Sequence, residues 1–312
     1  MRIFGGTESP DVHPAAFAMP AGMAIRYDRP TADIARSVTG YNVYHADSAA
    51  ERVDWFLPAP AMLCIGVGAG PITAQIRNQR FDPMPQASLI GPTSRALRVA
   101  TQGGTMVGIG ISAAGWIRMT GQSAHLCHNQ ILPAETLLGT EAVAGLIAAL
   151  EAAPDDHAVK PLLDGLLPPL FGRDDPQAAT IDALMALSVQ DGVIEVGDVA
   201  QRIGLHDTML RRVSQRAFGM PPKLLLRRAR FLRSFVHLFL GGDIDDRSRI
   251  DSSYFDMSHY LRDANAFLGT TPRRFLQAAT PFLAASIRAR MAVLGAPTQA
   301  LHEPPTAGRR AG

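Results

Sequence analysis

The chain has 312 residues, enough for two domains of ordinary size, and its 47% hydrophobic and 19% charged content is that of a soluble globular protein. No apolar run approaches the ~20 residues that span a bilayer, and the start of the chain lacks the apolar core of a signal peptide. With only Cys64 and Cys127, no disulfide framework is indicated. We therefore expect a cytoplasmic protein without a membrane partner.

The net charge of +2 conceals opposite charges on the two parts of the chain. Residues 1–201 hold 12 basic and 20 acidic side chains, a net charge of −8, whereas residues 202–312 hold 18 basic and 8 acidic ones, a net charge of +10. Such a split predicts that the C-terminal part meets a polyanion, and nucleic acid is the obvious polyanion for a basic helical domain. The alternative is a solvated basic face without a partner.

The N-terminal part has the pattern of a β-rich domain. Residues 1–22 are rich in Pro, Gly and Ala and predict a loose arm. Short apolar or alternating runs then follow between Gly and Pro turns, as in residues 72–76, and they predict an antiparallel β-barrel or sandwich domain over residues 1–135. Four aromatic residues are candidates for the wall of an effector pocket, although each could equally fill the core: Trp55, Phe56, Phe81 and Trp116.

Two weaker patterns lie outside the main domains. Leucines at helical spacing predict a helical dimerisation or linker region over residues 136–176, which could form a subunit contact or pack on its own sheet. Residues 286–312 are expected to form a disordered tail, because the sequence from Ala292 onward is rich in Pro, Ala and Gly.

Residues 199–233 combine helical periodicity with a strong positive charge. They hold nine Lys or Arg residues, and Asp207 is their one acid. Gly204 is placed to end a first helix, and further helices are expected from His206 to Phe218 and from Pro222 to Leu240. A short turn followed by a basic second helix is typical of a helix-turn-helix DNA reader.

A second patterned unit, YFDMSHYLRDANAFLGTTPRRF, follows an acidic segment that begins at Asp243. Its spacing repeats that of the first unit, because Tyr260 precedes Gly269 by the same interval as Leu210 precedes Gly219. Asp256 is well placed to cap the start of its main helix.

These two units, over about 100 residues, resemble the C-terminal domain of the AraC/XylS family of transcription regulators. The first match, DVAQRIGLHDTMLRRVSQRAFGMPPKLLLRRARF, looks like the family's first helix-turn-helix and the helix after it. The resemblance implies an α+β multidomain protein. Its all-α DNA-binding domain, over residues 177–285, would hold two helix-turn-helix units joined by a long helix, behind the β-rich sensor domain.

The second unit departs from the family pattern in its first helix. The family places an apolar-Ala pair and then a Gly there, whereas this chain has Ser248, Arg249 and Ser253. Residues 243–263 also hold six acids against three bases. We therefore expect the first unit to supply most of the affinity for DNA.

Side chains near the start of the second helix of each unit are expected to meet base edges in the major groove. Arg211 is the best candidate for reading a base, because Arg212 matches a family position that we expect to be structural. Arg227, Arg228 and Arg230 are expected to meet phosphates between the two units. The candidates for DNA contact are Asp207, Thr208, Arg211, Arg212 and Gln215 in the first unit, and Met257, Ser258, His259, Arg262, Arg273 and Arg274 in the second.

We therefore expect a sequence-specific DNA-binding transcription regulator that is not an enzyme and holds no cofactor or metal. Its N-terminal domain would sense a small molecule or mediate dimerisation. The expected partners are a double-stranded DNA operator, RNA polymerase if the protein is an activator, a small-molecule effector and a second copy of the chain. The alternative is a barrel-type metal-dependent enzyme or sensor with a vestigial DNA-binding domain, for which His125, Cys127 and His128 form the one suggestive cluster.

Overall fold

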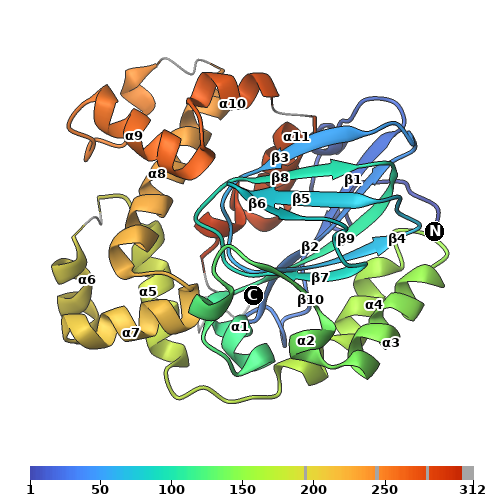
Figure 1. Ribbon diagram of the computed structural model, residues 1–312, viewed down its shortest axis with the longest axis horizontal. Coiled ribbons are helices and arrows are strands. Elements are labelled where there is room, and N and C mark those ends of the chain that lie inside the picture. Colours follow the sequence, from blue (N-terminus) through green and yellow to red (C-terminus); the bar gives the residue numbers. More distant parts are fainter. Residues whose placement is uncertain (193–194, 243–245, 279–280, 304–312) are drawn as a thin grey trace.

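The structure, a computed structural model, describes residues 1–192, 195–242, 246–278 and 281–303, and in its N-terminal half two antiparallel sheets lie against each other (Figure 1). In spatial order, the larger sheet contains β1 (Met23–Asp28), β2 (Val38–Ala46), β9 (Gly104–Ile111), β4 (Met62–Val67), β7 (Ala87–Ile90) and β10 (Ile131–Pro133). The smaller sheet contains β3 (Arg52–Phe56), β8 (Leu97–Thr101), β5 (Ile72–Ile76) and β6 (Gln79–Phe81).

Side-chain alternation explains how the two sheets pack. In β5, Ile72, Ala74 and Ile76 are buried while the residues between them are partly exposed, as the period-two pattern predicts. They pack against Cys64 of β4 and Ile90 of β7 in the larger sheet. The predicted antiparallel β-rich domain is therefore confirmed, as two packed sheets rather than a closed barrel.

Helices cover the outer face of the larger sheet (Figure 1). They are α1 (Ala113–Thr120), α2 (Glu135–Leu138), α3 (Thr140–Glu151) and α4 (Val159–Leu166), with 3-10 turns at Pro14–Phe17, Ala124–Cys127 and Pro168–Phe171. In α3, Val143, Leu146 and Leu150 are buried, and the helix packs on β4. The apolar face of this region is thus used inside the chain, and a subunit contact through it stays a prediction.

The first residues of the chain are not a loose arm, because two buried carboxylates hold them. Asp156 accepts hydrogen bonds from the backbone N–H groups of Phe4 and Gly5, at 3.2 and 2.8 Å. Asp28 accepts one from the N–H of Glu8 at 2.7 Å. These hydrogen bonds show that the expectation of a loose arm was wrong. Composition alone could not reveal them, because the partner Asp156 lies 151 residues after Gly5 in the chain.

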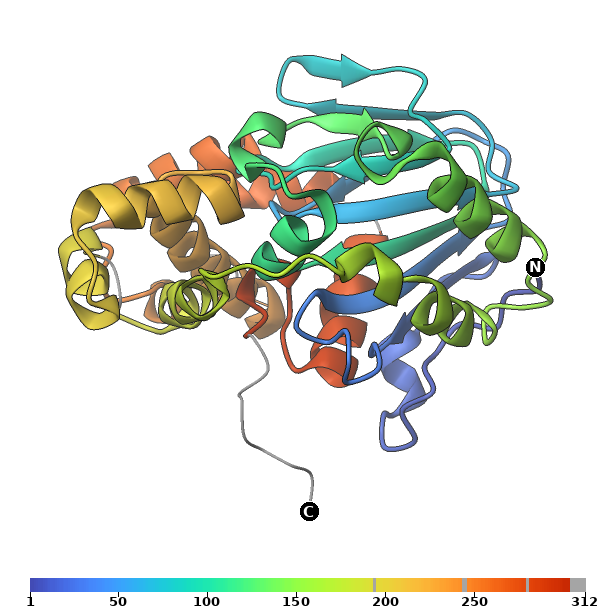
Figure 2. The same ribbon diagram turned by 90° about the horizontal axis from the view of Figure 1, so that it is seen from below.

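The C-terminal helical region lies to one side of the sheets (Figures 1 and 2). It contains α5 (Ala178–Val189), α6 (Val196–Ile203), α7 (Asp207–Phe218), α8 (Pro222–Gly241), α9 (Met257–Leu268) and α10 (Pro272–Ala278), with a 3-10 turn at Arg247–Arg249. Gly204 and Gly219 end α6 and α7 in the left-handed conformation, with φ of +75° and +76°, as the sequence predicts. Among the described residues, none of the helices is long and apolar enough to cross a membrane.

The chain then returns to the sheets through α11 (Pro281–Leu294) and a 3-10 turn at Gln299–Leu301. Ala285 and Ala289 of α11 pack against Ile25 and Tyr27 of β1. The Gln299 side-chain amide donates to the carbonyls of Ala61 and Ile111, at 2.9 and 3.2 Å. The predicted disordered tail is therefore wrong for residues 286–303, because their small apolar side chains pack against the sheet. Residues 304–312 lie outside the described part.

A buried ion network holds α8 to the second helical unit. The carboxylate of Asp263, on α9, pairs with Arg227 and Arg230 of α8 and accepts a hydrogen bond from the Tyr254 hydroxyl at 2.9 Å. Burial alone would raise the pKa of Asp263, but the hydrogen bonds from these three side chains more than offset it and hold the pKa below its usual value. The ionised carboxylate is thus part of the folded state.

Replacing Asp263 with Asn should destabilise the protein by about 3–5 kcal/mol at pH 7, because the almost fully buried guanidinium of Arg230 loses its charged partner. The wild-type carboxylate adds stability above the pKa of an unfolded Asp, and that stability is lost as the pH falls through the lower folded pKa. Urea unfolding of both proteins from pH 7 to pH 3 would show the difference shrinking. The control D246N breaks the exposed Arg249–Asp246 pair, and an equal effect in it would contradict this role of Asp263.

Candidate DNA-reading surface and effector cavity

Helix α7 presents most of the predicted first-unit residues to solvent. Leu210, Val213, Ala217 and Phe218 face inward and are buried. The opposite face leaves Asp207, Thr208, Arg211 and Arg212 exposed, with Gln215 half-buried. Sequence reasoning missed Met209, which lies beside them and is also exposed. The exposed face therefore combines two guanidinium groups with short polar side chains, the chemistry that reads base edges and phosphates.

An ion pair that joins α7 to the preceding segment fixes the orientation of this face. Arg216 donates from Nη1 to both oxygens of Asp175, at 3.1 and 3.0 Å, and Asp175 is almost fully buried. The Ser214 hydroxyl donates to the carbonyl of Met220 at 2.7 Å and so braces the turn into α8. Asp175 lies in the region 136–176 that was expected to form a dimerisation contact or a linker, yet its side chain anchors α7.

Helix α1 of the sheet domain packs against the first helical unit. Trp116 and Ile117 of α1 belong to the same apolar core as Ile181 of α5 and Leu210 and Phe218 of α7. The His125 ring also lies 3.3 Å, at Nδ1, from the carbonyl of Gly219. The first unit is therefore packed directly on the sheet domain, without a free linker between them.

In the second unit, only part of the predicted contact surface is exposed. Asp256 caps α9 as predicted, accepting a hydrogen bond from the N–H of His259 at 2.7 Å. Ser258 and Arg262 are exposed, as is Leu261, which sequence reasoning missed. Met257 and His259 are half-buried.

The side chain of His259 faces the inner network. Its Nε2 lies 3.3 Å from Nη2 of Arg230, and its ring lies 5.1 Å from that of Tyr254, edge to face. Arg273 and Arg274 of α10 are exposed at the far end. Between residues 246 and 256, the described helical structure is limited to the turn at Arg247–Arg249, which agrees with the weak apolar pattern of that segment.

Helix α8 uses most of its basic residues inside the molecule. Arg228 is 2% exposed and donates from Nη1 to the carbonyls of Thr93 and Ala59 in the sheet domain, at 2.8 and 3.3 Å. Arg230 is 6% exposed and pairs with Asp263. Arg227 pairs with the same carboxylate. The expectation that these three arginines meet phosphates was therefore wrong for Arg228 and Arg230, because both are buried, and Arg227 already has an internal partner.

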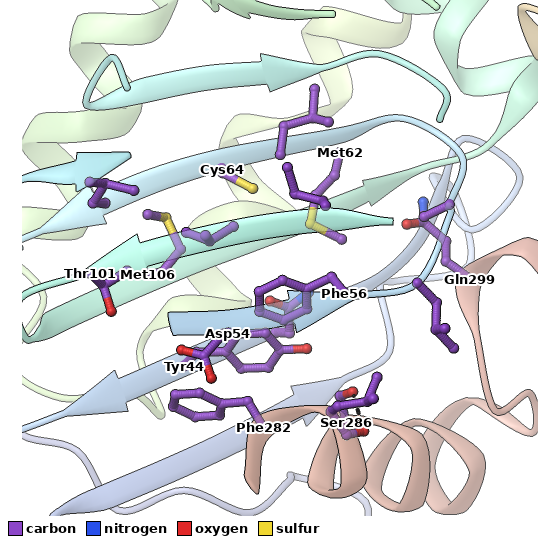
Figure 3. Close-up of a pocket in the computed structure, with 18 of the residues that line it drawn as sticks. Tyr44, Asp54, Phe56, Met62, Cys64, Thr101, Met106, Phe282, Ser286 and Gln299 are labelled. Carbon is purple, nitrogen blue, oxygen red and sulfur yellow. Dashed lines mark hydrogen bonds between the residues drawn. The ribbon is translucent and has the colours of Figure 1, made fainter. Parts of the chain in front are cut away.

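A cavity of about 190 Å³ lies between the two sheets, α11 and the turn at Gln299–Leu301 (Figure 3). Of the four predicted pocket aromatics, only Phe56 lines it. Trp55 packs edge to face on Phe275 of α10, at 5.8 Å between ring centroids. Trp116 is fully buried under the larger sheet and donates from Nε1 to the carbonyl of Gln122 at 2.9 Å. Phe81 packs in the core between the sheets.

The residues that do line the cavity include several that sequence reasoning missed. Tyr44 of β2 stacks between Phe56 and Phe282, with ring centroids 5.9 and 5.1 Å apart (Figure 3). Phe282 and Arg290 come from α11, in or next to the segment that was expected to be disordered. The alternating pattern of β2 was the available signal for Tyr44, whereas nothing in the sequence placed α11 against the sheets.

The side chains of His125, Cys127 and His128 differ in their exposure and do not form one site. It lies in a 3-10 turn rather than a strand, with Cys127 buried and His125 exposed. His128 is half-buried and its Nε2 lies 3.0 Å from the Ser94 hydroxyl. Burial and nearby arginines lower the pKa of His128 to about 4. Within the described residues, no group of three or more His, Cys, Asp or Glu side chains is placed to hold a metal ion.

The chain was also compared with known proteins. No family model and no curated protein matches it. Among solved structures it is similar to ToxT from Vibrio cholerae, with 14% identity over 78% of this chain and 99% of that chain and a TM-score of 0.43. A ToxT structure bound to an unsaturated fatty acid gives 11% identity over 76% and 97%, with a TM-score of 0.41.

The AraC-like transcriptional activator CuxR is also similar, with 11% identity over 76% of this chain and 92% of that chain and a TM-score of 0.22. Likeness of this degree identifies neither family nor function, and the function is therefore inferred below from the chain's own residues.

Replacing Arg228 with Ala should destabilise the protein by about 2–4 kcal/mol, because two hydrogen bonds from a buried cation are lost and the carbonyl of Thr93 loses this donor. The control Lys223→Ala, at an exposed position of the same helix, should change stability by less than about 0.5 kcal/mol. Denaturant unfolding gives both values. Wild-type stability combined with weaker DNA binding in R228A would instead identify Arg228 as a phosphate contact.

Proposed function

We propose that this protein is a sequence-specific DNA-binding transcription regulator of the AraC/XylS type, with a small-molecule effector site in its N-terminal domain. The observation that carries the proposal is the α6–turn–α7 unit. Its second helix is anchored from behind by Arg216 and Asp175 and exposes Arg211 and Arg212 on its free face. A short turn and a basic second helix have the geometry that places a helix in the major groove.

The charges that remain at the surface support this proposal. Of the nine basic residues between Val199 and Arg233, five are buried or paired inside the protein. The four that stay exposed are Arg202, Arg211, Arg212 and Lys223. They lie on α6, α7 and the start of α8, which pack on one another in that order, and phosphate contacts require exposed cations such as these.

The second unit is proposed as a weaker contributor. Its helix α9 exposes Ser258 and Arg262, while Arg274 stays exposed beyond it on α10. Helix α8, with 20 residues at 1.5 Å each, spans about 30 Å between the two units, close to the roughly 34 Å of one DNA turn. Two units on successive major grooves of one DNA face are therefore proposed. Contact with RNA polymerase and dimerisation remain further proposals.

Changing Arg211 to Ala should weaken binding to the preferred DNA site by about 1–3 kcal/mol and relax the preference at one base position, because Arg can hold a guanine with two hydrogen bonds. Stability should not change, since the side chain is exposed. The site is first selected from random double-stranded DNA, and affinity is then measured by fluorescence anisotropy. As the control, Arg202→Ala removes the same charge from α6 and should weaken binding equally on all sequences. An unchanged binding curve for R211A would refute the assignment.

The variant Arg262→Ala should lose less affinity than R211A on the same site, because α9 lies in the acidic unit and no α-helix precedes it in residues 246–256. Titrations of both variants over a range of salt concentrations measure the difference. A loss in R262A equal to or larger than that in R211A would show that the second unit is the main reader.

A further inference from the structure

The cavity between the sheets and α11 has an apolar wall with one charged feature. Its apolar surface comes from both sheets and includes Met62, Cys64 and Met106. Burial raises the pKa of the Cys64 thiol to about 12, so that side chain is neutral. The stacked rings of Phe56, Tyr44 and Phe282 form another part of the wall (Figure 3).

Arg290 of α11 lines this cavity without a full set of partners. The residue is 5% exposed, and its Nε and Nη2 have no hydrogen-bond acceptor among the described residues. Burial lowers the pKa of this guanidinium, although the neighbouring Tyr27 and Tyr44 act in the opposite direction. Buried charged groups are normally paired, so two unpaired donors on one buried guanidinium require a physical explanation.

The other charges of the cavity cancel. Among the described residues that line it, Arg52, Asp54 and Arg290 carry formal charges at neutral pH, when histidine is taken as neutral. Arg52 donates from Nε to Asp54 at 2.9 Å, which leaves the charge of Arg290 without a counterpart. Oδ1 of Asp54 has no hydrogen-bond partner within the described part of the chain, and a second acid group on a ligand would be repelled by it. The cavity is therefore suited to a single negative charge.

The two free donors also indicate the shape of the anion. Nε and Nη2 lie on the same edge of the guanidinium group, and this pair of N–H groups matches the two oxygens of a carboxylate. The hydroxyls of Tyr27 and Tyr44 lie 2.6 Å apart, and burial raises the pKa of both, so they remain neutral beside this charge.

We infer that the cavity binds a small apolar monocarboxylate, with its carboxylate paired to Arg290 and its apolar part between the sheets. A volume of about 190 Å³ compares with the roughly 150 Å³ apolar cavity that holds benzene, so the ligand has on the order of ten non-hydrogen atoms. This inference rests on the proposed function only in treating the ligand as an effector.

Binding there would act on the C-terminal part of the chain. Helix α11 follows the second helical unit in sequence and packs on β1. A carboxylate held by Arg290 would therefore add a link between α11 and the sheets, in addition to the contact between Phe275 of α10 and Trp55 of β3. Ligand binding would thus tighten the attachment of the second unit to the sheet domain.

Isothermal titration and thermal unfolding of the full chain, without DNA, test the inference with two ionised probes, phenylacetate and hexanoate. Phenylacetamide, the neutral match of phenylacetate, is the ligand control. At least one carboxylate should bind and raise Tm, and the amide should bind at least tenfold more weakly than phenylacetate. Absence of binding by both carboxylates at millimolar concentration, or equal binding of phenylacetate and the amide, would overturn the inference.

Two variants on α11 assign the charge. R290M should abolish the preference for carboxylate over amide while raising Tm without ligand, because an unpaired buried cation is removed. R290K should recover part of the preference. The matched change R288M, at an exposed position one half-turn away, should bind like the wild type. Carboxylate binding that survives in R290M would contradict the assignment of Arg290, whatever its effect on Tm.

These outcomes are separate from the test of DNA binding. Carboxylate binding by a protein that selects no DNA site would support the cavity assignment and refute the proposed function. Selective DNA binding by a protein that binds neither carboxylate would support the proposed function and refute the cavity assignment.

Discussion

The structure depends on the burial of α8 between the sheet domain and the second helical unit. A basic helix can be buried only where its charged side chains have hydrogen-bond or ion-pair partners. Helix α8 finds such partners both in the sheet domain and in the second helical unit. Arg228 reaches the carbonyls of Thr93 and Ala59 in the sheet domain, whereas Arg230 and Arg227 meet Asp263 of α9. These contacts join α8 to the sheets on one side and to the second helical unit on the other. The exposed face of α7 belongs to a helical region that packs on the sheets rather than to a domain on a tether.

Much of the helical region could be predicted from sequence because its signals are local. Gly204 and Gly219 end helices by a conformation that glycine adopts easily, and Asp256 caps α9 through its own side chain. Which arginines are exposed and which are buried could not be predicted from such local signals. A count of charges does not distinguish Arg211, which is exposed, from Arg228, whose partners are carbonyls more than 100 residues earlier in the chain.

The residues that line the cavity were even harder to predict from sequence than the contacts of the arginines. Phe56 lines it, but Trp55 and Trp116 serve packing contacts elsewhere, because neighbouring residues of a strand point to opposite faces and Trp116 lies on a helix outside the sheets. Tyr44, Phe282 and Arg290 meet there only because α11 returns from the far end of the chain to the first strand. The low-complexity composition from Ala292 onward conceals this return. Because the cavity is closed by a segment that follows both helical units in the chain, a ligand bound there would contact the segment connected to the proposed DNA-reading units.

The proposed reading of DNA sequence by the exposed face of α7 can be tested through the specificity ratio, the ratio of the affinities for specific and non-specific DNA. Affinity of the wild-type protein for its site selected from random double-stranded DNA is compared with affinity for a scrambled duplex of the same length, at several salt concentrations. A sequence-specific reader should bind the selected site at least about 10³-fold more tightly at physiological salt, and both affinities should fall as salt rises. Equal affinity for the two duplexes, or failure of the folded protein to enrich any sequence, would contradict it.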